Sequence, residues 1–308
     1  MVGPLDALSA RSLGEALPDH PFTFGARCLL MRGLANAWVS GPIPGFRAAV
    51  VQAPWIPREP IALGTDPEEV WNLLRRVSGW DCVNLPMELA GPLQRVLERE
   101  LGLPTRIYED VYYVLDRAPV PHHHPAVRFL TEQDLELVDR APPALQPVGY
   151  ASTLAALSGG VAAGGIADGD LVAVVWMSTS SEQYADLGGH TLEPWRNRGM
   201  GTAAAYLVAR EVQHRGFTPV WSTGEENFRS QHVAQKVGFH EYGREAYVIV
   251  PGLQSSGGFR GADGPPDRGP DSPADSLTPR DRPSGVSNSG PSSPGPDDRR
   301  AGRARRHA

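Results

Sequence analysis

The feature that most constrains the fold of this chain is a regular alternation of strand and helix patterns between residues 126 and 251. Two apolar, β-branched runs, Val161–Ile166 and Leu171–Met177, flank an Asp-Gly pair and predict a β-hairpin. A further strand is predicted over Tyr184–Leu192, and an amphipathic helix over Thr202–Arg215. This order predicts an α/β fold in which a mixed sheet carries helices on both faces.

The elements after residue 215 have clear end signals. A second helix is predicted to begin after Asn227, which is a favourable N-cap, and to end at Val237. Gly238 then supplies the left-handed conformation that stops a helix. The remaining strands are predicted over Pro219–Thr223 and Tyr247–Val250. The region therefore alternates strand, helix, strand, helix and strand after its hairpin.

The length of 308 residues exceeds that of a usual domain of about 100–150 residues. A proline-rich linker, residues 118–125, separates an N-terminal α/β region, 1–117, from the region 126–251. Residues 252–308 consist largely of Gly, Pro, Ser, Asp and Arg, so a disordered tail is expected. The tail ends in an arginine cluster, which suits either an electrostatic arm for RNA, DNA or anionic lipid or a solubilising segment; we favour the second interpretation.

Composition narrows the class of protein. A net charge of −6 argues against general nucleic-acid binding, except through the basic tail. The chain shows no signal-peptide core and no apolar run of about 18 residues, so we expect a cytoplasmic protein with no membrane partner. Cys28 and Cys82 make no disulfide framework and no metal motif. His122–His124 have no carboxylate or cysteine nearby in sequence, so no metal is predicted.

The segment from Thr191 to Thr202 carries the chemistry, because it joins a predicted strand to the start of a helix. Backbone N–H groups at a helix start have no helical partners and attract phosphates. Gly199 and Gly201 would let a pyrophosphate approach the backbone, and Arg196 and Arg198 add positive charge. The segment lacks the Lys-Ser/Thr of a Walker loop and the third glycine of a dinucleotide fingerprint. It therefore predicts an anion-binding loop of another kind.

The pattern Arg-x-x-Gly-x-Gly at residues 196–201 resembles the coenzyme loop of the GNAT N-acetyltransferase superfamily. The resemblance extends over most of residues 126–251. It includes the strand with Trp221 and the block Asn227-x-x-Ser230-x-x-x-Ala234-x-Lys236-Val-Gly-Phe239. It implies a GNAT-like acyl-CoA N-acyltransferase fold and an acetyl-CoA-dependent enzyme that transfers an acetyl group to an amine, with acetyl-CoA as co-substrate.

The same resemblance implies where coenzyme A binds. Backbone amides of residues 198–202 would hold its pyrophosphate. The strand end Thr191-Leu192 would pair with the pantetheine arm, and Asn227 would contact that arm. The implied coenzyme-binding residues are Thr191, Leu192, Arg196, Asn197, Arg198, Gly199, Met200, Gly201, Thr202, Asn227 and Ser230. A β-bulge or a close backbone approach is expected at Gly188-Gly189, in the strand that polarises the thioester carbonyl.

Transfer to an amine needs a general base, for which Asp186 and His190 are the titratable candidates in the strand before the loop. Each also has a purely structural interpretation, as a strand-end charge and as a hydrogen-bonded histidine. Many members of the superfamily carry a tyrosine that protonates the leaving thiolate where this chain has Ala234. Ser230 assists the thiolate instead, or the thiolate leaves unassisted.

Two segments of the chain resemble each other: Leu97–Leu115, and the end of the second region, Ala234–Val250. The N-terminal half is therefore interpreted as a degenerate second copy of the same fold, with chance similarity as the alternative. It lacks the coenzyme motif, so no coenzyme is expected there. The acceptor, a small-molecule or protein amine, and the oligomeric state stay open. A sensor that binds acetyl-CoA without turnover is the alternative function.

Overall fold

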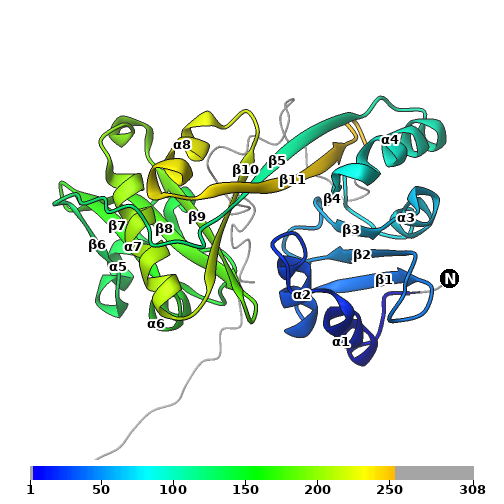
Figure 1. Cartoon of the computed structure of the whole chain (residues 1–308), viewed down its shortest axis with the longest axis horizontal. Helices are drawn as coiled ribbons and strands as arrows, with labels where there is room; N and C mark the ends of the chain where they lie inside the picture. The colour runs from blue at the N-terminus through cyan, green and yellow to red at the C-terminus, as the bar shows by residue number, and fades with distance from the viewer. Residues whose placement is uncertain (1–2, 254–308) are drawn as a thin grey trace, which may run out of the picture. The chain divides into compact units, whose positions relative to one another are not determined.

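The computed structural model describes residues 3–253 (Figure 1). The expected tail therefore lies almost entirely outside the described residues. Within them, eleven strands form one mixed sheet in the order β1-β2-β3-β4-β11-β5-β10-β9-β8-β7-β6. No helix in this part of the chain is long and apolar enough to cross a membrane.

Nine elements precede the linker. They are α1 (Ala7–Ala16), α2 (Phe24–Met31), β1 (Asn36–Ser40), β2 (Ala48–Gln52), β3 (Ile61–Gly64), α3 (Pro67–Leu74), β4 (Cys82–Pro86), α4 (Met87–Leu101) and β5 (Arg106–Val114).

The elements after the linker begin with the short edge strand β6. They are β6 (Val127–Phe129), α5 (Leu135–Asp139), α6 (Thr153–Gly159), β7 (Ala162–Ala167), β8 (Asp170–Ser180), β9 (Tyr184–Thr191), α7 (Met200–His214), β10 (Thr218–Gly224), α8 (Phe228–Val237) and β11 (His240–Ile249). Three short 3₁₀ helices lie between them, at Glu132–Asp134, Pro143–Leu145 and Glu193–Trp195.

The predicted elements of the second region are confirmed. The β7–β8 hairpin turns at Asp168 and Gly169, both of which have a positive φ. The side chain of Asn227 caps α8 by accepting a hydrogen bond from the backbone N–H of Ser230 at 3.2 Å. Gly238 ends α8 with a φ of 106°. Local sequence signals were sufficient here because each one acts within a few residues.

Of the two alternatives expected at Gly188-Gly189, the close backbone approach is confirmed and the bulge is not. The register of β8 and β9 shifts between Met177 and Thr179, so the extra residue is Ser178 on β8. Gly189 instead provides a close approach, because a Cβ there would lie 2.6 Å from the carbonyl oxygen of Val174. A glycine in a strand indicates that another group approaches the backbone closely, but it does not indicate which of two paired strands carries the extra residue of a bulge.

The order of elements repeats in the two halves. β1-β2-β3-α3-β4-α4-β5 in the first half matches β7-β8-β9-α7-β10-α8-β11 in the second. In each half the third and fourth strands are parallel and pair over only a short stretch. The helix before the last strand ends in each half at a left-handed glycine, Gly102 or Gly238. The interpretation of the N-terminal half as a second copy of the fold is therefore supported by its topology.

The two halves exchange their last strands, which the sequence did not indicate. β5 of the first half lies between β10 and β11, and β11 of the second half lies between β4 and β5 (Figure 1). Val111 and Tyr113 of β5 consequently belong to the hydrophobic core under α7 and α8. Ala246 and Val248 of β11 belong to the core of the first half. Neither half buries its core without a strand from the other.

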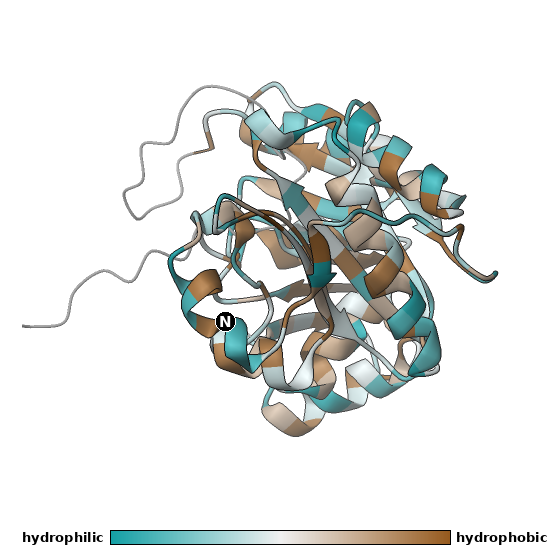
Figure 2. Ribbon diagram, turned by 90° about the vertical axis from the view of Figure 1, so that its left-hand side faces the viewer, coloured by the Kyte–Doolittle hydropathy of each residue, from teal (hydrophilic) through white to brown (hydrophobic). Residues whose placement is uncertain are grey.

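Helix amphipathicity fits this layering. The helical ribbons carry both hydrophilic and hydrophobic residues around their circumference (Figure 2). In α7 the apolar side is Ala204, Ala205, Val208, Ala209 and Val212, all fully buried. Small residues on this face let α7 lie close to β7, β8 and β9, which it contacts along its length. The start of α7 is thereby held firmly beside the end of β9.

Candidate active site

The site begins where β9 and β10 separate. These parallel strands pair only from Thr218 with Tyr184 to Val220 with Asp186, although both strands continue. Beyond the last pair lies a cavity of about 730 Å³. Residues of β9, of the loop after it, of β10 and of α8 line this cavity. The separation of two sheet strands therefore creates the space that a ligand can enter.

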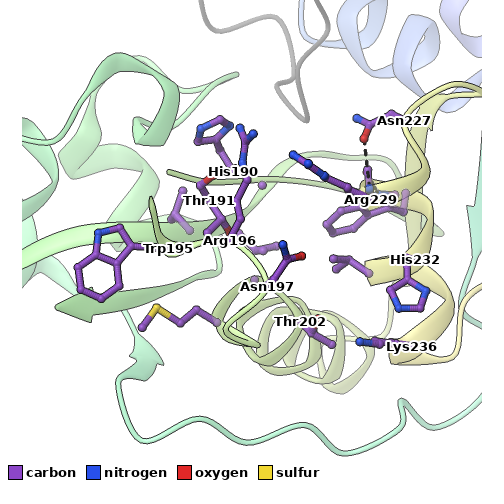
Figure 3. Close-up of a pocket in the computed structure, with 18 of the residues that line it drawn as sticks. His190, Thr191, Trp195, Arg196, Asn197, Thr202, Asn227, Arg229, His232 and Lys236 are labelled. Atoms are coloured by element: carbon purple, nitrogen blue, oxygen red, sulfur yellow. Dashed lines mark hydrogen bonds between the residues drawn. The ribbon is translucent and has the colours of Figure 1, made fainter. Parts of the chain in front are cut away.

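The first turn of α7 forms one wall of the cavity (Figure 3). The first hydrogen bond of the helix runs from the N–H of Ala203 to the carbonyl of Gly199 at 3.0 Å. Within residues 3–253, no hydrogen bond is shown for the backbone N–H groups of residues 198–202. Gly199 has a φ of 84°, and Asn197 has a φ of 61°. Alternating left-handed residues before uncapped N–H groups make an anion-binding concavity.

The two arginines of the loop also hold the loop in shape. Arg196 donates a hydrogen bond from Nε to the carbonyl oxygen of Thr191 at 3.0 Å. The guanidinium of Arg198 lies over the ring of Trp195, 4.6 Å from its centre. Both residues still line the cavity. Their positive charge is therefore fixed next to the start of α7.

Further cations come from α8, and the sequence analysis assigned them no role. Arg229 and Lys236 line the cavity, and Lys236 points toward Thr202 at the start of α7 (Figure 3). Lys236 is the only lysine in the chain. The spacing of seven residues between them puts both on one face of the helix, which is a signal that sequence reading could have used.

The other predicted coenzyme residues lie around the same space, with one difference. Thr191, Asn227 and Ser230 line the cavity. Leu192 is not among the lining residues; its N–H donates to the carbonyl of Val172 at 2.9 Å, and its side chain packs on buried apolar residues. The fold thus brings these residues of β9, the loop and α8 together, although they lie up to 39 positions apart in the chain, from 191 to 230.

Comparison with known proteins gives the family to which this geometry corresponds. The family model described as FR47-like protein matches residues 163–249, which contain β9, α7, β10, α8 and β11. Residues 163–249 are thus similar to an FR47-like domain of GNAT type. No curated protein matches the chain at the sequence level.

Solved structures show the same fold over both halves. A GCN5-related N-acetyltransferase-like protein from Streptococcus suis has 14% identity and a TM-score of 0.57, covering 79% of this chain and 99% of its own. A GCN5-related N-acetyltransferase from Kribbella flavida has 15% identity and a TM-score of 0.54, covering 79% and 96%. A tandem GNAT protein from the clavulanic acid biosynthesis pathway has 15% identity and a TM-score of 0.51, covering 80% and 96%. The fold is a tandem GNAT fold.

The cavity of the GNAT domain reaches both faces of the sheet. Because residues two apart on a strand share a face, Asp186 and His190 of β9 lie on the face opposite to α7 and α8. Tyr108 of β5 lies on that same face. His190 and Tyr108 both line the cavity. The cavity therefore passes between β9 and β10, from the helix-covered face to the face where Asp186 lies.

Asp186 lies on this face of the sheet but is not among the residues that line the cavity. Its side chain accepts a hydrogen bond from Ser178 Oγ, the residue that the β8 bulge inserts. Burial raises the pKa of its carboxyl above the usual value, the negative charge of Asp110 adds to this, and the bond from Ser178 opposes it. A carboxylate with a raised pKa is a stronger base than an ordinary aspartate.

Two more carboxyl groups on the same face were missed by sequence reasoning. Asp110 of β5 and Glu245 of β11 pair directly across the strand exchange and are 2% and 1% exposed. Burial raises the pKa of Glu245 to about 7. Acidic residues inside otherwise apolar strands were the available signal, but the sequence did not show that these two strands are neighbours.

The three linker histidines make protein contacts. His122 Nε2 lies 2.9 Å from the carbonyl oxygen of Lys236, the His123 ring packs edge-on against Tyr206, and His124 Nδ1 accepts from the N–H of Ala126 at 3.1 Å. Among residues 3–253 no group of three or more His, Cys, Asp or Glu side chains is placed to hold a metal ion. His122 therefore attaches the linker to α8, and His123 attaches it to α7.

Proposed function

We propose that the protein is an acetyl-CoA-dependent N-acetyltransferase that moves an acetyl group from coenzyme A to an amine. The observation that carries the proposal is the cavity between β9 and β10, which joins the uncapped start of α7 to the face that holds Asp186. A GNAT acetyltransferase needs both parts: an anion site for the coenzyme pyrophosphate and a base for the amine.

Coenzyme binding would use the N–H groups of residues 198–202 for the pyrophosphate. Arg229 and Lys236 add positive charge along α8. Thr191 and Asn227 lie on opposite sides of the cavity (Figure 3), where the pantetheine arm would pass between the end of β9 and the start of α8. The residues present therefore fit a long ligand that is anionic at one end and amide-containing along its length.

The amine would approach from the opposite face of the sheet. Asp186 accepts its proton, directly or through a water, as the nitrogen attacks the carbonyl carbon of the thioester. His190 lies four residues further along the same face and lines the cavity, and is the second candidate for this proton transfer. Acetyl-CoA supplies the acyl group, the C–N bond forms, and the C–S bond breaks.

The acceptor is proposed to be an amine of a small molecule or a protein. Acetyl-CoA as a substrate and a chain with only two cysteines both suit the cytoplasm.

The first test is calorimetric titration of the full chain with acetyl-CoA and desulfo-coenzyme A, followed by thiol release over a panel of amines. Binding of both ligands with thiol release for at least one amine is the expected result. Binding without release for any amine would support an acetyl-CoA sensor instead. Absence of binding would overturn the proposed coenzyme site.

A further inference from the structure

A strip of polar side chains crosses the middle of the sheet on the face opposite to α7 and α8. On this face, α1 and α2 pack on β1, β2 and β3, and α5 and α6 pack on β7 and β8. The strands between these two groups are β4, β11, β5, β10 and β9. Strand pairing places their polar residues on this same face, and we call them the polar strip: Asn84, Glu245, Asp110, Ser222 and Asp186.

The cavity opens beside the polar strip. Tyr108, His190 and Ile249 line the cavity from this face of the sheet. Asp110 follows Tyr108 by two residues on β5, and Asp186 precedes His190 by four residues on β9. Because a strand rises about 3.3 Å per residue, these two carboxyl groups start about 7–13 Å from the lining. A ligand at this end of the cavity therefore lies in the electric field of the strip.

The ionisable carboxyl groups of the polar strip all carry negative charge when ionised: Asp110, Glu245 and Asp186. Within residues 3–253, no arginine or lysine forms an ion pair with Asp186 or Glu245, and the neighbouring charges that act on them come from Asp110 and Glu88. Arg244 of β11 lies on the opposite face, where it forms an ion pair with Glu109 at 2.8 Å. The field at this end of the cavity is therefore that of anions.

One buried oxygen of the strip has no hydrogen-bond partner. Glu245 is 1% exposed, and within residues 3–253 no hydrogen bond is made to its Oε2 atom. Glu245 pairs directly with Asp110, and Tyr247, two residues further on the same face, pairs with the cavity residue Tyr108. A buried acceptor without a donor costs free energy. A cationic N–H group of a ligand is the donor that would also offset the charge of the strip.

The two ends of the cavity thus differ in charge. Arg198, Arg229 and Lys236, from the coenzyme loop and α8, provide cations at the end where the anionic coenzyme would bind. The polar strip provides carboxyl groups at the other end. A cationic acceptor is favoured there, and an acceptor with a carboxylate is disfavoured. The nitrogen that attacks a thioester has to be neutral, so the favoured positive charge belongs to a second group of the acceptor.

We infer that the acceptor is an amine with a second cationic group, an ammonium or guanidinium, which lies against the polar strip. The inference rests on the proposed transferase function and names its substrate class. The reacting amine gives its proton to Asp186, the C–N bond forms, and the C–S bond breaks with its electron pair on sulfur, which leaves as the thiolate. The second cationic group keeps its proton throughout.

A binding experiment with three acceptors of equal chain length tests this without turnover. The full chain is saturated with desulfo-coenzyme A and titrated by calorimetry at pH 8 with 1,4-diaminobutane, butylamine and 4-aminobutyrate. A charge about 8 Å from a carboxylate changes affinity roughly 30-fold at an effective dielectric constant of about 20. The diamine is therefore expected to bind at least about tenfold more tightly than butylamine, with 4-aminobutyrate weakest. The preference is expected to shrink as salt is added, because salt screens charges.

Two variants remove charges of the strip one at a time. Asp110→Asn and Glu245→Gln are each expected to lower the affinity ratio of diamine to butylamine about three- to tenfold. Affinity for acetyl-CoA is expected to stay within a few fold in both. Glu109→Gln is the matched control, because it removes the same charge from the residue next to Asp110, on the opposite face of β5. The control is expected to keep the ratio of the wild type.

Turnover gives a second readout of the same preference. In the thiol-release assay, kcat/KM is expected to be highest for the diamine and lowest for 4-aminobutyrate. The charge-removing variants are expected to raise KM for the diamine more than KM for butylamine. A purely structural role of Asp110 or Glu245 would instead change both values of KM by the same factor.

Three outcomes would overturn the inference. The first is that the wild type binds butylamine as tightly as the diamine, or 4-aminobutyrate more tightly. The second is that it binds none of the three while desulfo-coenzyme A is bound. The third is that both Asp110→Asn and Glu245→Gln keep the ratio of the wild type. Thiol release with other amines in any of these cases would leave the transferase function standing. Absence of acetyl-CoA binding would overturn the proposed function itself.

Discussion

The two halves of the molecule place a helix after their third strand, and the starts of these two helices differ. In α3 the side chain of Asp66 accepts from the N–H groups of Glu68 and Glu69 at 3.0 and 3.2 Å, and Pro67 has no N–H. In α7 no side chain caps the helix, and its first turn contains no acidic residue. The first-turn groups that α7 presents to the cavity are satisfied or absent in α3.

The comparison shows that the same position in the fold can be either a ligand site or a helix start capped by a side chain. A side-chain cap and a bound phosphate compete for the same N–H groups, and two glutamates in the first turn of α3 add a charge that repels an anion. The strand before each helix differs as well. Where β9 last pairs with β10 it carries Asp186, whereas β3 pairs with β4 through Ile61. Only the second half combines an open helix start with a titratable group.

The largest expected effect comes from the titratable group. Asp186→Asn is expected to lower kcat/KM by about 10²- to 10⁴-fold, because it removes a general base of nearly the same shape. Affinity for acetyl-CoA is expected to stay within a few fold. In the wild type, activity is expected to fall as pH drops through the raised pKa of Asp186, at a higher pH than for an ordinary aspartate.

The measurements for this variant are initial rates against pH and calorimetry with acetyl-CoA. Asp139→Asn, on the exposed end of α5, is the control. Full activity in Asp186→Asn would show that His190 or another group is the general base.

The second-largest effect is expected from blocking the anion site at the start of α7. Gly201→Glu is expected to weaken acetyl-CoA binding by at least about 100-fold while the fold is retained, since it adds bulk and negative charge to the anion site. The Cβ alone would lie 2.9 Å from Thr191 Oγ1. Calorimetry and circular dichroism are the measurements. Gly91→Glu in α4 is the matched control, because no atom lies within 3.4 Å of a Cβ there. Unchanged affinity in Gly201→Glu would refute the phosphate site.

The exchanged strands offer a pH-dependent test of how the halves are joined. The pKa of Glu245 is about 7 in the folded state, so the folded protein retains this proton where the unfolded chain has lost it. Stability is therefore expected to fall as pH rises from about 4.5 to 7, and to stay lowered above 7.

Glu245→Gln removes this ionisation and is expected to raise the free energy of unfolding at pH 8 by roughly 1–3 kcal/mol, with a smaller change at pH 5. The free energy of unfolding is measured by urea denaturation at both pH values. Glu241→Gln, on the same strand and exposed, is the control. Equal effects at the two pH values would show that Glu245 does not hold a proton in the folded state.

The smallest effect is expected in the first half. Asp66→Ala removes the cap of α3 and is expected to lower the free energy of unfolding by about 1 kcal/mol. It is not expected to create a second coenzyme site, because Glu68 and Glu69 remain. Denaturation and the stoichiometry of acetyl-CoA binding are the measurements. A second equivalent of bound acetyl-CoA in this variant would show that the cap alone separates the two helix starts.

Much of the second region could be predicted because its signals are local. Asn227 and Gly238 define the ends of α8 through bonds to neighbours within four residues. The Asp-Gly pair sets the β7–β8 turn for the same reason. The coenzyme loop could also be predicted, because its glycines and arginines act within the loop itself. The bulge at Ser178 was not readable, because register depends on how two strands pair.

What the sequence by itself determined is thus the elements, their order and the open loop at the start of α7. The tertiary structure alone decided that β5 and β11 change places, and with that exchange the pairing of Asp110 with Glu245. It also brought the indole of Trp221 to Ser230. The two last strands carry similar patterns, so each suits either half; only the packing of complete cores selects the partner.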